Sequence, residues 1–109
     1  MAKVGISPLA RADLREIGDF ISRERRNPDA ALRMIRRFQE AMLPLREFPE
    51  MGSPLLAAGK QSAPYRYLVC GSYLIFCHLS GDRVLIDRVL YGRRDYLALL
   101  FGDRLEEKE

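Results

Sequence analysis

The stretch from residue 65 to residue 92, YRYLVCGSYLIFCHLSGDRVLIDRVLYG, decides the fold. Aromatic and β-branched residues dominate it, and two turn signals, Gly71-Ser72 and Ser80-Gly81-Asp82, divide it into three runs. A two-residue loop with glycine at its first position is typical of a β-hairpin. The stretch therefore predicts an antiparallel three-stranded meander over residues 65–70, 73–79 and 83–90.

Both faces of this meander are expected to be apolar. With a two-residue loop at Gly71-Ser72, alternate residues share a face. One face carries Leu68, Cys70, Tyr73, Ile75, Cys77 and Leu79, and the other carries Tyr65, Tyr67, Val69, Leu74, Phe76 and His78. Because a helical hairpin covers one face only, the second needs its own cover, which is the last helix of the chain, a second copy or another protein.

Two helices precede the meander. Ser7-Pro8 and Asn27-Pro28 are helix start signals, and apolar residues recur at helical spacing after each of them. We expect helices over residues 8–25 and from 28 to about 45, packed as an antiparallel hairpin, with a kink or an early end at Pro44. Lys3 to Ile6 is compatible with a fourth short strand.

The remaining segments complete a single α+β domain spanning residues 1–109. Residues 55–63 have a loop-like composition, and residues 93–101 are expected to form a short terminal helix that ends at Gly102. An acidic tail follows at about residues 103–109. The fold expected from the sequence is thus an N-terminal helical hairpin on a C-terminal antiparallel sheet with a short terminal helix.

Composition limits the environment and the chemistry. The 109 residues are 48% hydrophobic, yet no apolar run is long enough to span a membrane and the N-terminus lacks a signal peptide. We therefore expect a cytoplasmic protein with no membrane association, in which Cys70 and Cys77 are buried thiols rather than a disulfide. Fifteen of the 18 cationic residues are arginines, a bias that suits an anionic partner.

The sequence offers little for catalysis. One histidine, His78, and two separated cysteines fall short of a metal site, so neither a metal nor another cofactor is expected. His78 itself is expected to be a packed, hydrogen-bonded strand residue. Glycine-rich phosphate loops and nucleophile motifs are also absent from the sequence.

The candidate functional stretch is the end of the last strand. Its candidate residues are Arg88, Tyr91, Arg93, Arg94 and Asp95. Burying Arg88 among apolar neighbours requires a carboxylate. Asp87 points to the opposite face, whereas Asp95, returning from the turn, is placed to pair with it. Two interpretations stay open, an ion-paired strand end and a patch that binds an anion or a protein.

Four motifs, SPLARADLREI at 7–17, LREFPEMG at 45–52, GSYLIF at 71–76 and RVLYGRRD at 88–95, occur in this order. On these motifs the chain, over about residues 6 to 100, resembles the RelE/ParE superfamily of bacterial type II toxin–antitoxin toxins, and specifically the ParE-like branch. The resemblance implies two helices packed on an antiparallel sheet, and an antitoxin that covers the toxin with an amphipathic segment.

The resemblance also divides the expected function. RelE-like members cut messenger RNA on the ribosome with strand Lys and Arg residues and a C-terminal Tyr or His, whereas ParE-like members inhibit DNA gyrase. Here Tyr73 stands where RelE-like toxins have a strand arginine, Arg66 is the sole cation of the preceding strand, and no C-terminal catalytic aromatic is evident. The set for RNA cleavage is incomplete.

The resemblance therefore implies a toxin that binds DNA gyrase, with Arg66 and Tyr73 as secondary candidates. A RelE-like endoribonuclease and an inactive homologue that still binds antitoxin remain as alternatives. Tyr91 replaces a histidine that is common in the ParE-like branch, a change that leaves packing possible but removes a group that titrates near neutrality.

The expected partner is a cognate antitoxin of the ParD-like, ribbon-helix-helix type, in a hetero-oligomer with this chain. Its docking surface is expected over the apolar sheet face and the arginines of the second helix. The candidate residues are Arg33, Arg36, Arg37, Leu68 and Ile75.

Overall fold

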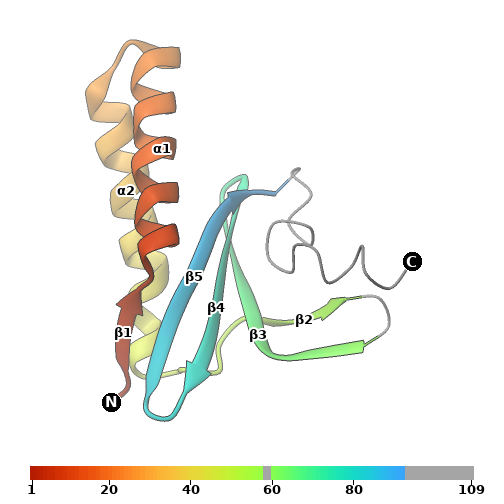
Figure 1. Ribbon diagram of the computed structural model, residues 1–109. Helices are drawn as coiled ribbons and strands as arrows, with labels where there is room; N and C mark the ends of the chain where they lie inside the picture. The colour runs from red at the N-terminus through yellow and green to blue at the C-terminus, as the bar shows by residue number, and fades with distance from the viewer. Residues whose placement is uncertain (58–59, 93–109) are drawn as a thin grey trace.

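The structure, a computed structural model, describes residues 1–57 and 60–92. Two helices form one layer against one face of a five-stranded sheet (Figure 1). The elements are β1 (Lys3–Ile6), α1 (Pro8–Arg25), α2 (Pro28–Met42), the 3-10 helix η1 (Leu43–Arg46), β2 (Ser53–Ala57), β3 (Lys60–Cys70), β4 (Tyr73–Ser80) and β5 (Arg83–Tyr91). The spatial order of the strands is β1-β5-β4-β3-β2.

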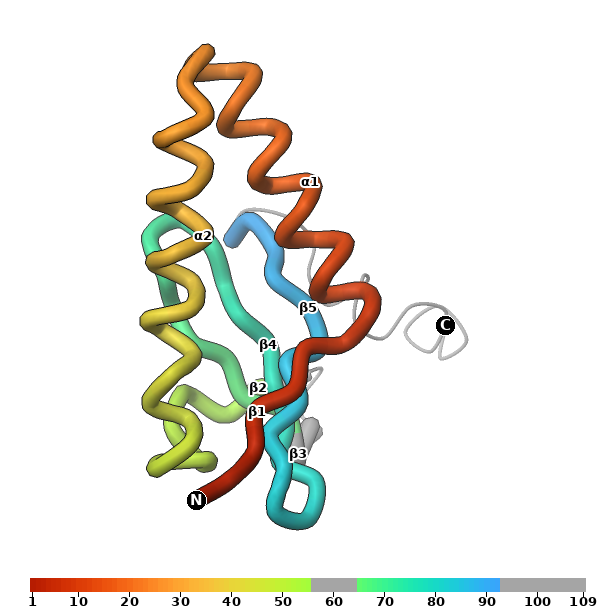
Figure 2. Tube along the Cα trace, turned by 90° about the vertical axis from the view of Figure 1, so that its left-hand side faces the viewer, coloured from red at the N-terminus to blue at the C-terminus, as the bar shows by residue number. Residues whose placement is uncertain are grey.

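Both helices begin where the sequence predicts. The Ser7 side chain accepts a hydrogen bond from the Ala10 backbone N–H, and Asn27 caps α2 in the same manner. The predicted early end near Pro44 is confirmed, because α2 stops at Met42 and one 3-10 turn follows. The two helices run antiparallel, and their upper turns project beyond the end of the sheet (Figure 2).

The predicted meander of β3, β4 and β5 is confirmed, with Cys70 opposite Tyr73 at the hairpin loop. The fourth short strand that the sequence allows at Lys3–Ile6 is also present, as β1. It pairs in parallel with the first half of β5, so the sheet is mixed rather than purely antiparallel.

The loop expected over residues 55–63 was wrong. Residues 53–57 form β2, and β3 begins at Lys60 rather than at residue 65, so both ends of the predicted loop belong to paired strands. Small residues without a two-residue period give no local strand signal, so β2 arises from pairing with the edge of β3. The predicted terminal helix at 93–101 and the acidic tail lie outside the described residues.

The prediction of two apolar sheet faces is confirmed. The larger core lies between the helices and the sheet, where Phe38, Leu45 and Ile75 are fully buried. A smaller cluster of Leu55, Phe76 and Leu90 occupies the opposite face, and β2 contributes Leu55 to it.

Cys70 and Cys77 are buried free thiols, as predicted. They stand opposite different partners in the sheet, Tyr73 and Arg66. Among the described residues, no helix has the length and apolar character needed to cross a membrane.

Candidate functional site

The end of β5 is tied to α1 by a buried ion pair. Arg88 Nε donates to Asp13 Oδ2 at 2.8 Å, and Arg88 Nη2 donates to Asp13 Oδ1 at 2.9 Å. Both side chains are largely buried, with exposed fractions of 18% for Arg88 and 7% for Asp13. Hydrogen bonding to Asp13 raises the pKa of Arg88 against the opposing effect of burial, and the charges of Asp13 and Glu16 add to the rise.

The carboxylate that Arg88 requires is therefore present, but it belongs to Asp13. Asp95, the partner expected from the sequence, lies outside the described residues. A signal for Asp13 did exist in the sequence, because it stands three residues after Ala10 and four before Ile17, on the apolar side of α1.

Asp13 also completes the backbone hydrogen bonding of β5. The pairing with β1 stops at Ile6, opposite Ile86, and no other strand of the described residues pairs with the rest of β5 on that side. Asp13 Oδ2 accepts a hydrogen bond from the Val89 backbone N–H at 2.9 Å. One carboxylate thus holds both the side chain of Arg88 and the strand edge beside it.

A β-bulge interrupts β5 immediately before Arg88. Phe76 pairs with Arg88 and Cys77 pairs with Ile86, which leaves Asp87 as the extra residue. Asp87 Oδ2 lies 2.8 Å from His78 Nδ1, so Asp87 is not the partner of Arg88, as predicted. Burial raises the pKa of Asp87, and the hydrogen bond and charge of His78 oppose this rise.

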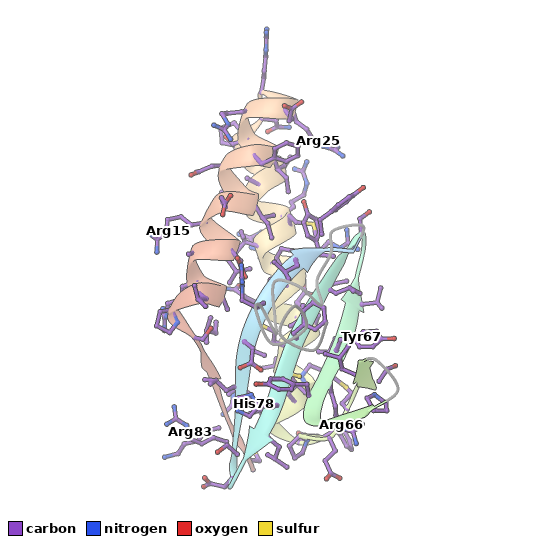
Figure 3. The ribbon with its side chains drawn as sticks, turned by 45° about the vertical axis from the view of Figure 1, so that its right-hand side comes forward. Arg15, Arg25, Arg66, Tyr67, His78 and Arg83 are labelled. Atoms are coloured by element: carbon purple, nitrogen blue, oxygen red, sulfur yellow. The ribbon has the colours of Figure 1, made fainter. Side chains whose placement is uncertain are left out.

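His78 is the packed, hydrogen-bonded residue that the sequence predicts. Besides its contact with Asp87, its ring meets Tyr65 edge-on at 5.3 Å. It lies on β4, the central strand of the sheet, opposite Tyr65 on β3 (Figure 3). No group of three metal-binding side chains occurs within residues 1–57 and 60–92.

A cavity of about 490 Å³, which we call the α1–β5 pocket, opens beside this ion pair. Its lining residues are Asp13, Glu16, Ile17, Phe20, Tyr73, Val89, Leu90 and Tyr91. The rings of Tyr73 and Tyr91 meet edge-on at 5.7 Å, and Phe38 meets Tyr73 in the same way at 5.4 Å. Burial, with a smaller effect from Tyr91, raises the pKa of Tyr73.

The pocket joins two residues predicted from the sequence, Tyr73 and Tyr91, to Asp13 and to three further α1 residues that were missed, Glu16, Ile17 and Phe20. The sequence gives these three no distinctive mark, because acidic and apolar residues at helical spacing are common in amphipathic helices. Its walls are mainly aromatic and aliphatic, and its charge comes from carboxylates. Such a cavity suits an apolar or cationic group and disfavours an anion.

The other predicted residues lie elsewhere. Arg66 Nη1 donates to the Gly52 backbone oxygen at 3.2 Å, so it supports the turn before β2. Arg33, Arg36 and Arg37 are exposed on α2, and the Arg37 guanidinium lies beside the hairpin loop at Gly71. Arg93 and Arg94 lie outside the described residues.

The two apolar residues predicted for antitoxin docking face the helices. Leu68 is partly buried against the main core. Ile75 has no exposed surface, which corrects its assignment to a docking surface. The helical hairpin packs on this sheet face, so Ile75 belongs to the internal core.

This arrangement of two helices on a five-stranded mixed sheet is an α+β fold that solved structures share. A chain described as "Chromosomal ParDE TA system from P. aeruginosa" is 20% identical, with a TM-score of 0.70, covering 84% of this chain and 96% of that one. A crystal structure of a mutant of YafQ from E. coli is 15% identical, with a TM-score of 0.54, covering 94% of this chain and 100% of that one. No curated protein matches the sequence.

The family is identified at the sequence level. The model for "ParE toxin of type II toxin-antitoxin system, parDE" matches residues 4–96, which is most of the chain. The chain therefore belongs to the ParE toxin family, and the resemblance found in its four motifs is confirmed.

Proposed function

We propose that this protein inhibits cell growth by binding DNA gyrase, and that a cognate ParD-like antitoxin of the ribbon-helix-helix type neutralises it in the cytoplasm. Membership of the ParE family supports a toxin with an antitoxin partner. The choice between binding and RNA cleavage depends on the chemistry of the site.

The observation that carries the proposal is the charge of the α1–β5 pocket. Metal-free RNA cleavage needs cations on the scissile phosphate and groups that move protons. In the described part of the chain, the cation beside the pocket is Arg88. Two nitrogens of its guanidinium, Nε and Nη2, donate hydrogen bonds to Asp13. Asp13 thus neutralises this cation, and Glu16 at the pocket would repel a phosphate, so the geometry favours protein binding over cleavage.

The arginines of α2 support the antitoxin contact. Arg33, Arg36 and Arg37 are exposed on one helix, and Arg37 continues this positive surface to the β3–β4 hairpin. An acidic amphipathic segment would complement these cations. With Ile75 buried, the proposed antitoxin surface consists of the three arginines and the accessible edge of Leu68.

The deciding experiment assays the purified toxin, separated from its antitoxin, in two reactions. We expect it to block supercoiling by gyrase and to leave ribosome-bound messenger RNA intact. Tyr91→Ala should weaken gyrase inhibition, whereas Leu9→Ala, at an exposed apolar residue on α1 outside the pocket, should not. Unchanged supercoiling together with cleavage of the message would replace this proposal with the RelE-like endoribonuclease.

Expression without the neighbouring gene tests the third class. We expect growth to stop and to recover when the neighbouring gene is supplied. Normal growth at a confirmed level of folded protein would identify an inactive homologue that retains antitoxin binding.

A further inference from the structure

The α1–β5 pocket lies where the helical layer leaves the sheet. The upper turns of α1 and α2 extend past the ends of the strands, so α1 continues over the end of β5 without a strand beneath it (Figures 1 and 2). Phe20 is 52% exposed and Tyr91 is 40% exposed, although both line the pocket. Large apolar side chains are thus presented to solvent around a preformed cavity.

The charges of α1 are divided between its two sides. Arg15 extends away from the sheet (Figure 3). Asp13, Glu16, Ile17 and Phe20 follow the spacing of one helix face and line the pocket. In a chain with a net charge of +3, this side of α1 is apolar and acidic.

The acidic character of the pocket comes from Glu16. The charge of Asp13 is matched by Arg88. Glu16 is exposed at the pocket; its charge acts on Arg88 without contact, and among the described residues it forms neither a hydrogen bond nor an ion pair. Counted over residues 1–57 and 60–92, two carboxylates against one guanidinium leave a net charge of −1 at the pocket.

Aromatic walls and an unmatched carboxylate define the ligand chemistry. A cation held against the faces or edges of tyrosine and phenylalanine rings is attracted by the ring electrons, and an aliphatic stem gains contact with the same rings. Lysine and arginine side chains combine these two features. A carboxylate or phosphate would meet repulsion from Glu16.

We propose that the α1–β5 pocket is an anchor site for one lysine or arginine side chain of the antitoxin, with its stem on Phe20 and Tyr91 and its charge at Glu16. The identity of the partner rests on the proposed function. A partner anchored there covers Tyr91, which belongs to the candidate functional stretch, so anchoring and neutralisation are achieved by the same contact. The antitoxin is thus expected to carry a cationic anchor in addition to acidic residues that meet the α2 arginines.

The first test needs no antitoxin. The ¹⁵N-labelled protein is titrated with phenethylammonium and, separately, with 3-phenylpropionate, which carries the same ring and the opposite charge. We expect chemical-shift changes centred on Ile17, Phe20 and Tyr91, and binding of the cation at least about fivefold tighter than that of the anion. Glu16→Gln should abolish this preference, and Glu24→Gln on the same helix should preserve it. Equal binding of the two probes, or shifts scattered over the surface, would overturn the proposal.

The second test measures the affinity of the antitoxin encoded by the neighbouring gene. We expect Glu16→Gln and Phe20→Ala each to weaken binding by about five- to tenfold, with Glu24→Gln and Leu9→Ala as controls on the same helix that change it little. Normal binding to both pocket variants would overturn the anchor while leaving the proposed function intact. Failure of the antitoxin to bind the unmodified chain would instead contradict the proposed function, and the probe titration would still decide the pocket chemistry.

Discussion

Asp13→Ala removes the acceptor of three hydrogen bonds and leaves a buried guanidinium without its counter-charge. Arg88 retains an exposed fraction of 18%, so water compensates part of this loss, whereas the Val89 N–H beside it loses its acceptor. Removing one partner of a buried ion pair costs about 3–5 kcal/mol. With partial hydration of Arg88, we expect a loss near the lower limit, about 3 kcal/mol in the free energy of unfolding.

The size of this loss makes it measurable by urea unfolding followed by far-UV circular dichroism. A domain of this length has an unfolding free energy of about 5–15 kcal/mol, so a fifth or more of its stability is at stake. With a urea dependence of about 1–1.5 kcal/mol per molar, the midpoint should fall by about 2–3 M. Asp13→Asn keeps the shape and one acceptor and should lose about half as much. Asp19→Ala, at an exposed position of α1, serves as the control and should change stability by less than about 0.5 kcal/mol.

A double-mutant cycle with Arg88→Met isolates the pair. We expect a coupling energy of at least about 2 kcal/mol, because each single change leaves a buried charge that the double change removes. Additive losses in the cycle, or a loss below about 1 kcal/mol for Asp13→Ala, would refute the assignment of Asp13 as the residue that fixes the end of β5.

Three further predictions concern the turn before β2, a buried thiol and the bulge. Gly52 has a φ of 104°, and a Cβ there would lie 2.7 Å from the Tyr67 backbone oxygen, so Gly52→Ala should cost about 2 kcal/mol or more. Gly81→Ala, where a Cβ meets nothing within 4 Å, should cost about 1 kcal/mol, and equal losses would contradict the argument. Burial raises the pKa of Cys77 to about 11, so a thiol reagent at neutral pH should label it only as the chain unfolds; rapid labelling of the native protein would be inconsistent with this. Burial also raises the pKa of Asp87 above 3.8, so the native state binds more protons than the unfolded state just above that pH. The free energy of unfolding should therefore fall as pH rises through this window, relative to Asp87→Asn, and parallel pH profiles of the two proteins would count against it.

The elements with strong periodicity could be predicted from the sequence. Helix start signals located α1 and α2, and the alternation after residue 65 located the meander, because these signals depend on neighbours a few residues apart. β2 carries no such period. Its pairing of Pro54 with Arg66 and of Ala57 with Lys60 is a tertiary contact. Local propensity cannot report a strand that exists through its partner.

The candidate site was harder to predict because its parts are far apart in the chain. Arg88 and Asp13 are separated by 75 residues, and nothing in the spacing around Arg88 distinguishes Asp13 from a nearer carboxylate. The cost of burying a charge predicts that Arg88 needs a carboxylate partner. Which carboxylate it meets depends on how α1 packs on β5, and this packing is not evident from the sequence. For the same reason, alternation placed Ile75 on an apolar face but could not tell which face the helices cover.

The bulge at Asp87 connects these features. Val84 and Ile86 face the helices, and strict alternation would bring Arg88 and Leu90 to the same side. The extra residue resets the alternation, so Val89 joins the main core, Leu90 joins the opposite cluster and the Tyr91 ring meets Tyr73. Removing the bulge would direct Tyr91 away from Tyr73 and dismantle the α1–β5 pocket. The Ser7 hydroxyl donates to the Asp87 backbone oxygen at 2.9 Å, and Asp13 accepts from Val89, so the first two turns of α1 hold the bulge from both sides. The geometry of the candidate site is therefore determined by the start of α1, more than 70 residues earlier in the chain than the stretch that carries the site.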